Sequence, residues 1–255
     1  MTRFVANGDV ALAVEVRGHG PRTVVFAHGW ISGRRMWYDV VDRLDAERFT
    51  AHLMDFRGAG LSDRPPDGHD LEGYASDLRA VLDAVRPDVL VAHSMGAKVA
   101  QFVAASGDLA LERLVLVAPG SARASTMSPK HRALAESAFG SRARIERFQR
   151  AAMVRDVAPD VMERVVTDAL IGQREAWFGW YDRGRTADFG DRVGNIRVPT
   201  VAVAGEKDPL APPQRVKRDV ADAIEGALFV QLRRAGHNLP IETPDEVAGI
   251  VARVV

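Results

Sequence analysis

Short apolar runs rich in β-branched residues alternate along the chain with segments whose apolar residues recur every three or four positions. Residues 23–27, 89–92 and 114–117 are apolar almost throughout, which is typical of strands buried on both faces. Residues 71–85 carry the clearest helical stripe, with charged side chains on the opposite face. This alternation indicates an α/β fold, a mostly parallel sheet with helices on both faces. Further strands are expected at residues 10–16, 50–54, 200–204 and 228–232, and further helices at 95–105, 213–224 and 245–255.

Residues 121–194 break this alternation. They contain helical stripes and an aromatic cluster at 177–181, but no run typical of a strand. Because they follow a predicted strand, we expect them at the carboxyl edge of the sheet, where open α/β sheets place their binding sites. The expected organisation is a core of residues 1–120 and 195–255 with a helical cap, residues 121–194, inserted into it.

Composition excludes several classes of function. The 255 residues include no cysteine, which excludes disulfides, thiolate zinc sites, iron–sulfur clusters and a cysteine nucleophile. The 34 basic and 34 acidic side chains balance, which argues against a nucleic-acid partner bound through bulk positive charge. No apolar run approaches the ~20 residues that span a bilayer. The first nine residues lack the apolar stretch of a secretory signal, so we expect a cytoplasmic protein.

The strongest chemical signal is the segment Ala92-His93-Ser94-Met95-Gly96, where a predicted strand ends and a predicted helix begins. A serine between small residues at such a junction is typical of a nucleophile turn, usually Gly-x-Ser-x-Gly, whose sharp bend exposes the hydroxyl. Small flanking residues avoid collisions with the neighbouring backbone, and here Ala92 replaces the first glycine. The competing interpretation is a serine that only caps the helix.

A second segment favours the nucleophile interpretation. Residues 28–30, His-Gly-Trp, directly follow an earlier predicted strand. In this chemistry a His-Gly pair there shapes a loop whose backbone N–H helps to bind an oxyanion. The expected oxyanion donors are the backbone N–H groups of Trp30 and Met95.

A third signal is the order of the polar residues that follow the later strands. Asp208 and His237 each come just after a predicted strand, so the chain order is Ser94, Asp208, His237, as expected when serine occupies this turn. Glu206 is close enough in sequence to Asp208 to be a rival acid. His93 is expected to be a packed neighbour of the nucleophile, and not a second base.

Five motifs stand in a fixed order along the chain: His28-Gly29, Asp55-Phe56-Arg57-Gly58-Ala59-Gly60-Leu61-Ser62, Ala92-His93-Ser94-Met95-Gly96, Val198-Pro199-Thr200 with Gly205-Glu206-Lys207-Asp208-Pro209, and Gly236-His237. Together they resemble the α/β-hydrolase superfamily. The resemblance spans nearly the whole chain, although residues 121–194 match only as a generic helical cap. It implies Ser94 as the nucleophile, His237 as the base and Asp208 as the acid that orients the base, with no metal and no organic cofactor.

The resemblance also implies a reaction. A serine hydrolase of this type transfers the acyl group of a small-molecule ester, lactone or thioester to water through an acyl-enzyme on Ser94. A C–C bond hydrolase of ring-cleavage products uses the same residues, but such relatives usually carry tryptophan after the catalytic histidine, where this chain has Asn238. Dehalogenases and most epoxide hydrolases of this fold place aspartate at the position of Ser94. A ligand-binding protein without catalysis is the alternative from a different class.

The expected cap contains aromatic and basic residues that each have two interpretations. The aromatic side chains either line a substrate pocket or pack the cap onto the core. The arginines form either a solvated helix face or a surface that attracts an anionic substrate. The aromatic candidates are Trp177, Trp180, Phe139 and Phe148, and the arginines are Arg142, Arg144, Arg147, Arg150 and Arg155.

Overall fold

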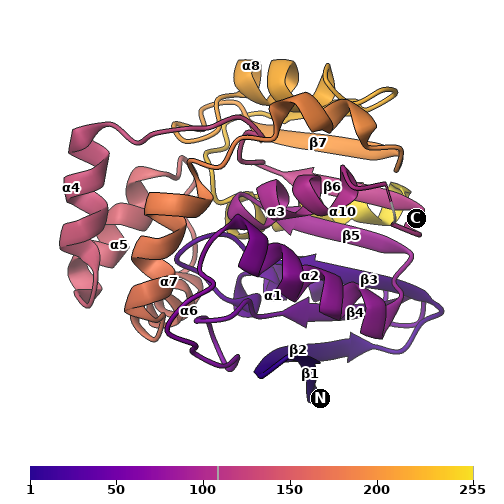
Figure 1. The fold of residues 1–255 in the computed structure, drawn as a ribbon, viewed down its shortest axis with the longest axis horizontal. Helices are drawn as coiled ribbons and strands as arrows, with labels where there is room; N and C mark the ends of the chain where they lie inside the picture. The colour runs from indigo at the N-terminus through magenta and orange to yellow at the C-terminus, as the bar shows by residue number, and fades with distance from the viewer. Residues whose placement is uncertain (108, 255) are drawn as a thin grey trace.

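A mostly parallel sheet runs through the molecule (Figure 1). The computed structural model describes residues 1–107 and 109–254, and its eight strands follow the order β1-β2-β4-β3-β5-β6-β7-β8. Strands β3 to β8 run parallel to their neighbours, and only β1–β2 and β2–β4 pair antiparallel. The predicted α/β fold is therefore confirmed. The strands are β1 (Thr2–Asn7), β2 (Val10–Gly18), β3 (Arg22–Ala27), β4 (Phe49–Met54), β5 (Val89–His93), β6 (Arg113–Val117), β7 (Thr200–Gly205) and β8 (Leu228–Leu232).

One strand, β1, was not predicted from the sequence. It joins β2 through a two-residue turn in which Gly8 has a φ of 58°, a left-handed conformation that glycine adopts without strain. β1 lies at the edge of the sheet, and half of its residues are exposed. It therefore lacks the continuous apolar run that identifies the buried strands.

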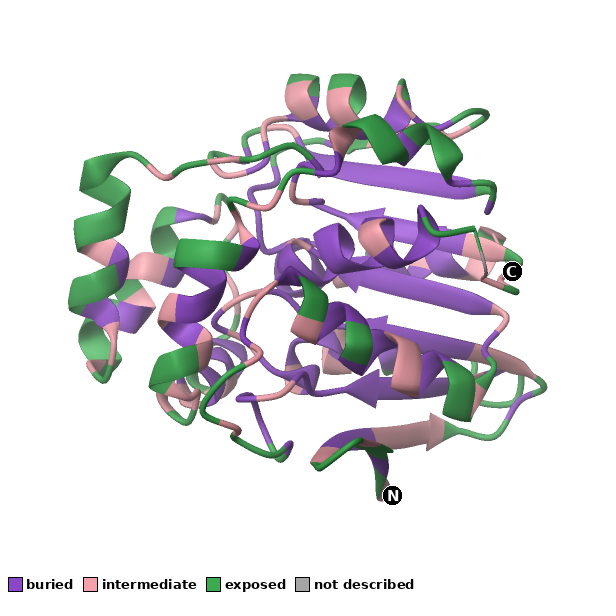
Figure 2. Ribbon diagram, viewed as in Figure 1, coloured by how far each residue is buried: buried purple, intermediate pink, exposed green. Residues whose placement is uncertain are grey.

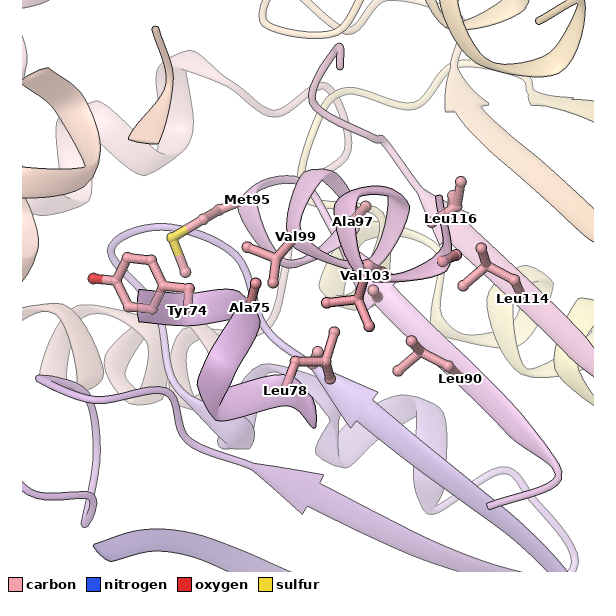
Figure 3. Packing of buried hydrophobic residues seen from close by; sticks show 14 of the residues in the cluster. Tyr74, Ala75, Leu78, Leu90, Met95, Ala97, Val99, Val103, Leu114 and Leu116 are labelled. Carbon is pink, nitrogen blue, oxygen red and sulfur yellow. The ribbon is translucent and has the colours of Figure 1, made fainter. Parts of the chain in front are cut away.

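Helices cover both faces of the sheet, and the strands between them are largely buried (Figure 2). Successive residues of β3 point to opposite faces: Val25 packs with α2 and α3, and Phe26 packs with α1 and α10. Figure 3 shows α2 and α3 in contact over β5 and β6. The α-helices are α1 (Tyr38–Val41), α2 (Leu71–Val85), α3 (Met95–Ala104), α4 (Pro129–Ala138), α5 (Arg142–Ala151), α6 (Pro159–Leu170), α7 (Arg174–Gly179), α8 (Pro213–Val216), α9 (Leu239–Glu242) and α10 (Pro244–Val254).

Two of the expected helices differ in detail from the structure. The helix expected at 213–224 ends as an α-helix at Val216 and continues as a π-helical segment. The last expected helix corresponds to α10, but its final residue, Val255, lies outside the described residues. The shorter helical segments are η1 (Arg34–Trp37), η2 (Trp180–Gly184), η3 (Gly190–Asn195) and η4 (Lys217–Ala221).

The chain between β6 and β7 forms α4 to α7, which lie beyond the carboxyl ends of the parallel strands (Figure 1). No strand occurs in residues 118–199, all of which the structure describes. Apolar residues of α4 to α7, among them Ile145, Met162 and Trp177, pack into a separate cluster that also includes Ile31 of the loop after β3. Within residues 1–107 and 109–254, no helix is long and apolar enough to cross a membrane.

Leu78 tests the contribution of the contact between α2 and α3. Its side chain is fully buried in the cluster that Figure 3 shows. Leu78→Ala leaves a cavity there, so we expect the free energy of unfolding to fall by about 2–5 kcal/mol, as measured by urea denaturation. The matched control is Asp83→Ala, at an exposed position of the same helix, with an expected change within about 0.5 kcal/mol. Equal losses in the two variants would contradict this account of the core.

Candidate functional site

Ser94 lies between β5 and α3 in a conformation unusual for a residue with a side chain. Its φ of 49° and ψ of −108° lie outside the regions that ordinary residues prefer. Hydrogen bonds fix both sides of the bend: the Ser94 N–H donates to Val117 O at 3.0 Å, and the Ser94 carbonyl accepts from the Lys98 N–H at 3.0 Å. The surrounding structure therefore holds the strained turn, with the side chain of Ser94 partly exposed.

Glycines allow the backbone of neighbouring loops to approach this turn closely. A Cβ atom on Gly96 would lie 2.5 Å from the carbonyl oxygen of His28, and one on Gly29 would lie 2.7 Å from Nδ1 of His93. Real Cβ atoms do not approach other atoms so closely, so both positions require glycine. Ala92 replaces the other glycine of the motif, and it is fully buried within β5.

The structure brings Ser94, Asp208 and His237 together from the loops that follow β5, β7 and β8. Nε2 of His237 lies 2.8 Å from Oγ of Ser94, and Nδ1 lies 2.7 Å from Oδ2 of Asp208. Because an ionised carboxylate only accepts hydrogen bonds, Nδ1 carries the proton of a neutral imidazole. Nε2 is then the nitrogen that accepts the hydrogen bond from the Ser94 hydroxyl.

Asp208 remains ionised although its side chain is fully buried. Burial alone raises the pKa of Asp208, but attraction to His237 and hydrogen bonds outweigh burial and hold this pKa below its usual value. Its Oδ1 accepts from the N–H groups of Leu210 at 2.7 Å and Ala211 at 2.8 Å. The rival acid, Glu206, instead accepts from a backbone N–H of the loop after β8.

The buried carboxylate of Glu242 holds the loop that carries His237. It accepts from the N–H groups of Gly236 and Asn238 at 3.0 Å each. It also accepts from the N–H of Val154 at 2.8 Å, in the connection that follows α5. Sequence reasoning missed Glu242, whose only sign is an acid directly after the apolar residues 239–241.

His93 is a neutral neighbour of His237. Its Nε2 lies 2.9 Å from the carbonyl oxygen of His237, so Nε2 carries the proton and donates. Burial, together with repulsion from His237, lowers the pKa of His93 to about 3. Its Nδ1 has no hydrogen-bond partner in the part of the chain that the structure describes. His93 therefore fixes the backbone at His237 through one hydrogen bond.

The backbone N–H groups of Trp30 and Met95 are available beside Ser94. Both residues line the cavity into which Ser94 opens. Met95 is the first residue of α3, where an N–H has no partner within the helix. Among residues 1–107 and 109–254, neither N–H donates to another residue. Two such donors suit an oxyanion that forms at the serine.

The cavity at Ser94 is small and partly apolar. Its free volume is about 90 Å³, whereas one water molecule needs about 10–15 Å³ of such volume. Ser94 and His237 contribute to its wall, and so do two of the aromatic candidates, Trp180 and Phe148. The space suits a short acyl group better than a long chain.

The other two aromatic candidates lie outside this cavity. The ring of Trp177 packs 5.8 Å from that of Trp30 and 5.4 Å from that of Phe139, between ring centroids. Phe139 lines a separate hollow between α4 and α7. Both residues belong to the apolar cluster of α4 to α7, and Trp177 also lines a second cavity together with Trp30 and Met95.

Three of the five candidate arginines, Arg142, Arg150 and Arg155, pair with acids away from the cavity. Arg142 forms a salt bridge with Glu163 at 2.6 Å, and Arg150 pairs with Glu146 at 2.8 Å. None of the five candidate arginines contributes to the wall of the Ser94 cavity. Their geometry fits a solvated helix face.

Lys98 is a buried cation of the site that sequence reasoning missed. It is 1% exposed and lines the Ser94 cavity. Its Nζ donates to the carbonyl oxygens of Arg185 at 2.9 Å and Ala187 at 2.6 Å. The available signal was a lone charge in the otherwise apolar segment 95–105.

Comparison with known proteins identifies the family. A model of the alpha/beta hydrolase family matches residues 24–250. The chain is 27% identical to an AB hydrolase superfamily protein, YisY, of Bacillus subtilis (strain 168), over 96% of this chain and 95% of that protein. Over 47% of each chain, it is 37% identical to N-formylmaleamate deformylase of Pseudomonas putida. An esterase from Exiguobacterium antarcticum superposes with a TM-score of 0.89 at 21% identity, covering 100% of this chain and 99% of that one. The chain belongs to the alpha/beta hydrolase family.

Proposed function

We propose that the protein is a serine hydrolase that cleaves a small-molecule carboxylic ester through an acyl-enzyme on Ser94. The observation that carries this proposal is the continuous hydrogen-bonded chain Ser94–His237–Asp208, which opens into a closed-in cavity. A serine hydroxyl is a weak nucleophile unless an oriented base takes its proton. In the hydrogen-bonded series, His237 is the base and Asp208 is the group that orients it.

In the first step, Oγ of Ser94 attacks the ester carbonyl carbon while Nε2 of His237 takes the hydroxyl proton. The carboxylate of Asp208 stabilises the imidazolium that forms. The carbonyl oxygen becomes an oxyanion, which accepts hydrogen bonds from the N–H groups of Trp30 and Met95. The tetrahedral intermediate collapses, His237 returns the proton to the leaving alkoxide, and an alcohol departs from acyl-Ser94.

In the second step, water replaces the alcohol. Nε2 of His237 takes a proton from water, whose oxygen attacks the acyl carbon of acyl-Ser94. The same two N–H groups stabilise the second oxyanion. Collapse expels Oγ of Ser94, which recovers its proton from His237, and the carboxylic acid is released.

Residues 121–194 act as a cap over this reaction, with residues 1–120 and 195–255 as the core. Support comes from their place beyond the carboxyl ends of the strands (Figure 1) and from cavity walls that both parts supply, Trp180 and Phe148 from one and Met95 from the other. A cap in this position excludes bulk water from the acyl-enzyme. It also limits the size of the acyl group.

Ser94→Ala tests the nucleophile. A fluorophosphonate probe is expected to label the wild-type protein once, at Ser94, because this serine alone bonds to His237 among the described residues. The variant loses labelling, and its kcat on p-nitrophenyl acetate falls by up to about 10⁶. Mass spectrometry locates the label.

The matched control for labelling is Ser121→Ala. Ser121 lines the same cavity, but its hydroxyl bonds to Asp219, so labelling at Ser94 is retained. Labelling that persists in Ser94→Ala would overturn the assignment. A wild-type protein that cleaves a ring-cleavage dienone but no ester would favour the C–C bond hydrolase instead.

Asp208→Asn tests the orienting acid. An amide at this position favours the wrong imidazole tautomer, so kcat is expected to fall by up to about 10⁴ while the fold is kept. The control is Glu206→Gln, which also replaces a carboxylate with an amide, two residues away. We expect it to leave kcat near the wild-type value. Circular dichroism verifies the fold of both variants. The assignment fails if Glu206→Gln is the crippling change.

Trp180→Ala tests the acyl pocket against a matched variant, Trp177→Ala. Trp180 lines the Ser94 cavity, whereas Trp177 packs among the helices of the cap. Truncation of Trp180 enlarges the cavity, so kcat/KM for a hexanoate ester is expected to rise at least tenfold relative to an acetate ester. Trp177→Ala leaves this ratio unchanged and lowers stability by about 3–5 kcal/mol. An unchanged ratio in Trp180→Ala would exclude this residue from the pocket wall.

A further inference from the structure

The cavity at Ser94 has an uneven distribution of charge. Lys98, Arg185 and Arg215 contribute to its wall beside Ser94 and His237, and no aspartate or glutamate among residues 1–107 and 109–254 does. The whole chain, in contrast, carries as many acidic as basic side chains. A small cavity whose charged wall residues are all cations concentrates positive potential at the point where a substrate enters.

The side-chain hydrogen bonds of the two arginines go to neutral oxygen atoms. Within residues 1–107 and 109–254, neither Arg185 nor Arg215 forms a salt bridge with a carboxylate. Arg185 donates from Nε to Oγ of Ser125 at 3.1 Å, and Arg215 donates to the carbonyl oxygen of Leu210. Most of their guanidinium N–H groups therefore stay available to a ligand.

The two guanidinium groups also repel each other. Burial lowers the pKa of Arg185, and repulsion by Arg215 lowers it further. The charge of Arg215 helps to lower the pKa of Asp219, but Asp219 forms its salt bridge with Arg218, at 2.7 Å. An anion between the two guanidinium groups would relieve this repulsion.

Lys98 holds the backbone at Arg185 in place. Its ammonium group donates to the carbonyl oxygens of Arg185 and Ala187, so it holds the backbone that carries Arg185. Burial and the Arg185 charge lower the pKa of Lys98 to about 8, against the attraction of Asp188. Lys98 therefore remains mostly protonated at neutral pH and adds to the positive potential.

We propose that Arg185 and Arg215 form a carboxylate-binding subsite, so that the substrate is an ester that carries a carboxylate near its scissile bond. This rests on the proposed function of Ser94. The planar guanidinium fork matches the two oxygens of a carboxylate. The free volume of the cavity, about 90 Å³, suits a small substrate that carries one such planar anion.

The test compares esters that differ in one charge. In each pair, a carboxylate in one ester replaces a methyl group in the other. The carboxylate is on the acyl side in the pair monomethyl succinate and methyl butyrate. It is on the alcohol side in the pair 4-acetoxybenzoate and 4-methylphenyl acetate. Proton release measures kcat/KM for each. Arg185→Gln and Arg215→Gln are each expected to lower kcat/KM for the anionic member of one pair by about 10- to 150-fold, the effect of losing a hydrogen bond to a charged group. The neutral member should change less than about threefold.

Two further variants separate this effect from damage to the fold. Arg185→Lys keeps the positive charge but not the planar fork. Its kcat/KM for the anionic ester should therefore lie between the values of the wild-type protein and Arg185→Gln. Arg142→Gln removes one positive charge at an exposed position paired with Glu163. It should leave both members of each pair unchanged. Equal losses on anionic and neutral esters in Arg185→Gln and Arg215→Gln would overturn the subsite while the ester hydrolase stands.

Binding distinguishes failure of the subsite from failure of the hydrolase. If no ester is cleaved and Ser94 is not labelled, the proposed function is wrong. Calorimetric titration with succinate then still tests the subsite. Affinity at least tenfold lower for Arg185→Gln than for the wild-type protein would support an anion site, and equal affinities would exclude it.

Discussion

The strained turn at Ser94 is the constraint on which the rest of the site depends. A φ of 49° at a residue with a side chain persists only because β5, β6 and α3 hold both ends of the bend. That bend brings α3 so close to the loop after β3 that only glycine fits at positions 29 and 96. The same closeness brings Trp30 and Met95 into the wall of the cavity that Ser94 also lines. One backbone conformation thus accounts for two of the motifs read from the sequence, the turn at residues 92–96 and His28-Gly29.

Electrostatics divides the site into two parts. On one side, the buried carboxylate of Asp208 accepts hydrogen bonds from His237 and from two backbone N–H groups. Groups of the protein itself therefore stabilise its negative charge. On the other side, the cavity wall contains cations whose charge no carboxylate of the wall balances. A buried charge without a partner is unfavourable. In the proposed subsite, the carboxylate of a ligand supplies a balancing negative charge.

Much of this arrangement was predictable, and the reason differs between core and cap. Parallel strands must end at one edge, so the order of Ser94, Asp208 and His237 after strands was enough to predict that they meet. The fold of the core followed from continuous apolar runs, although the edge strand β1 lacked one. In residues 121–194 the spacing of apolar residues showed helices but not which face meets the cavity, so Trp177 and Trp180 were indistinguishable. Arg185 and Arg215 were missed because they are far apart in sequence and only the fold unites them.

The contacts of the His237 loop with the chain after α5 have a consequence for how such enzymes diversify. The N–H of His237 donates to Ala152 O at 2.7 Å, and a Cβ on Gly236 would lie 2.5 Å from that same oxygen. Glu242 ties both segments together. The position of His237 is therefore tied to the chain that follows α5. Under the proposed function, a new set of helices grafted between β6 and β7 would have to bring a matching carbonyl for residue 237, so substrate selection and reactivity would change together.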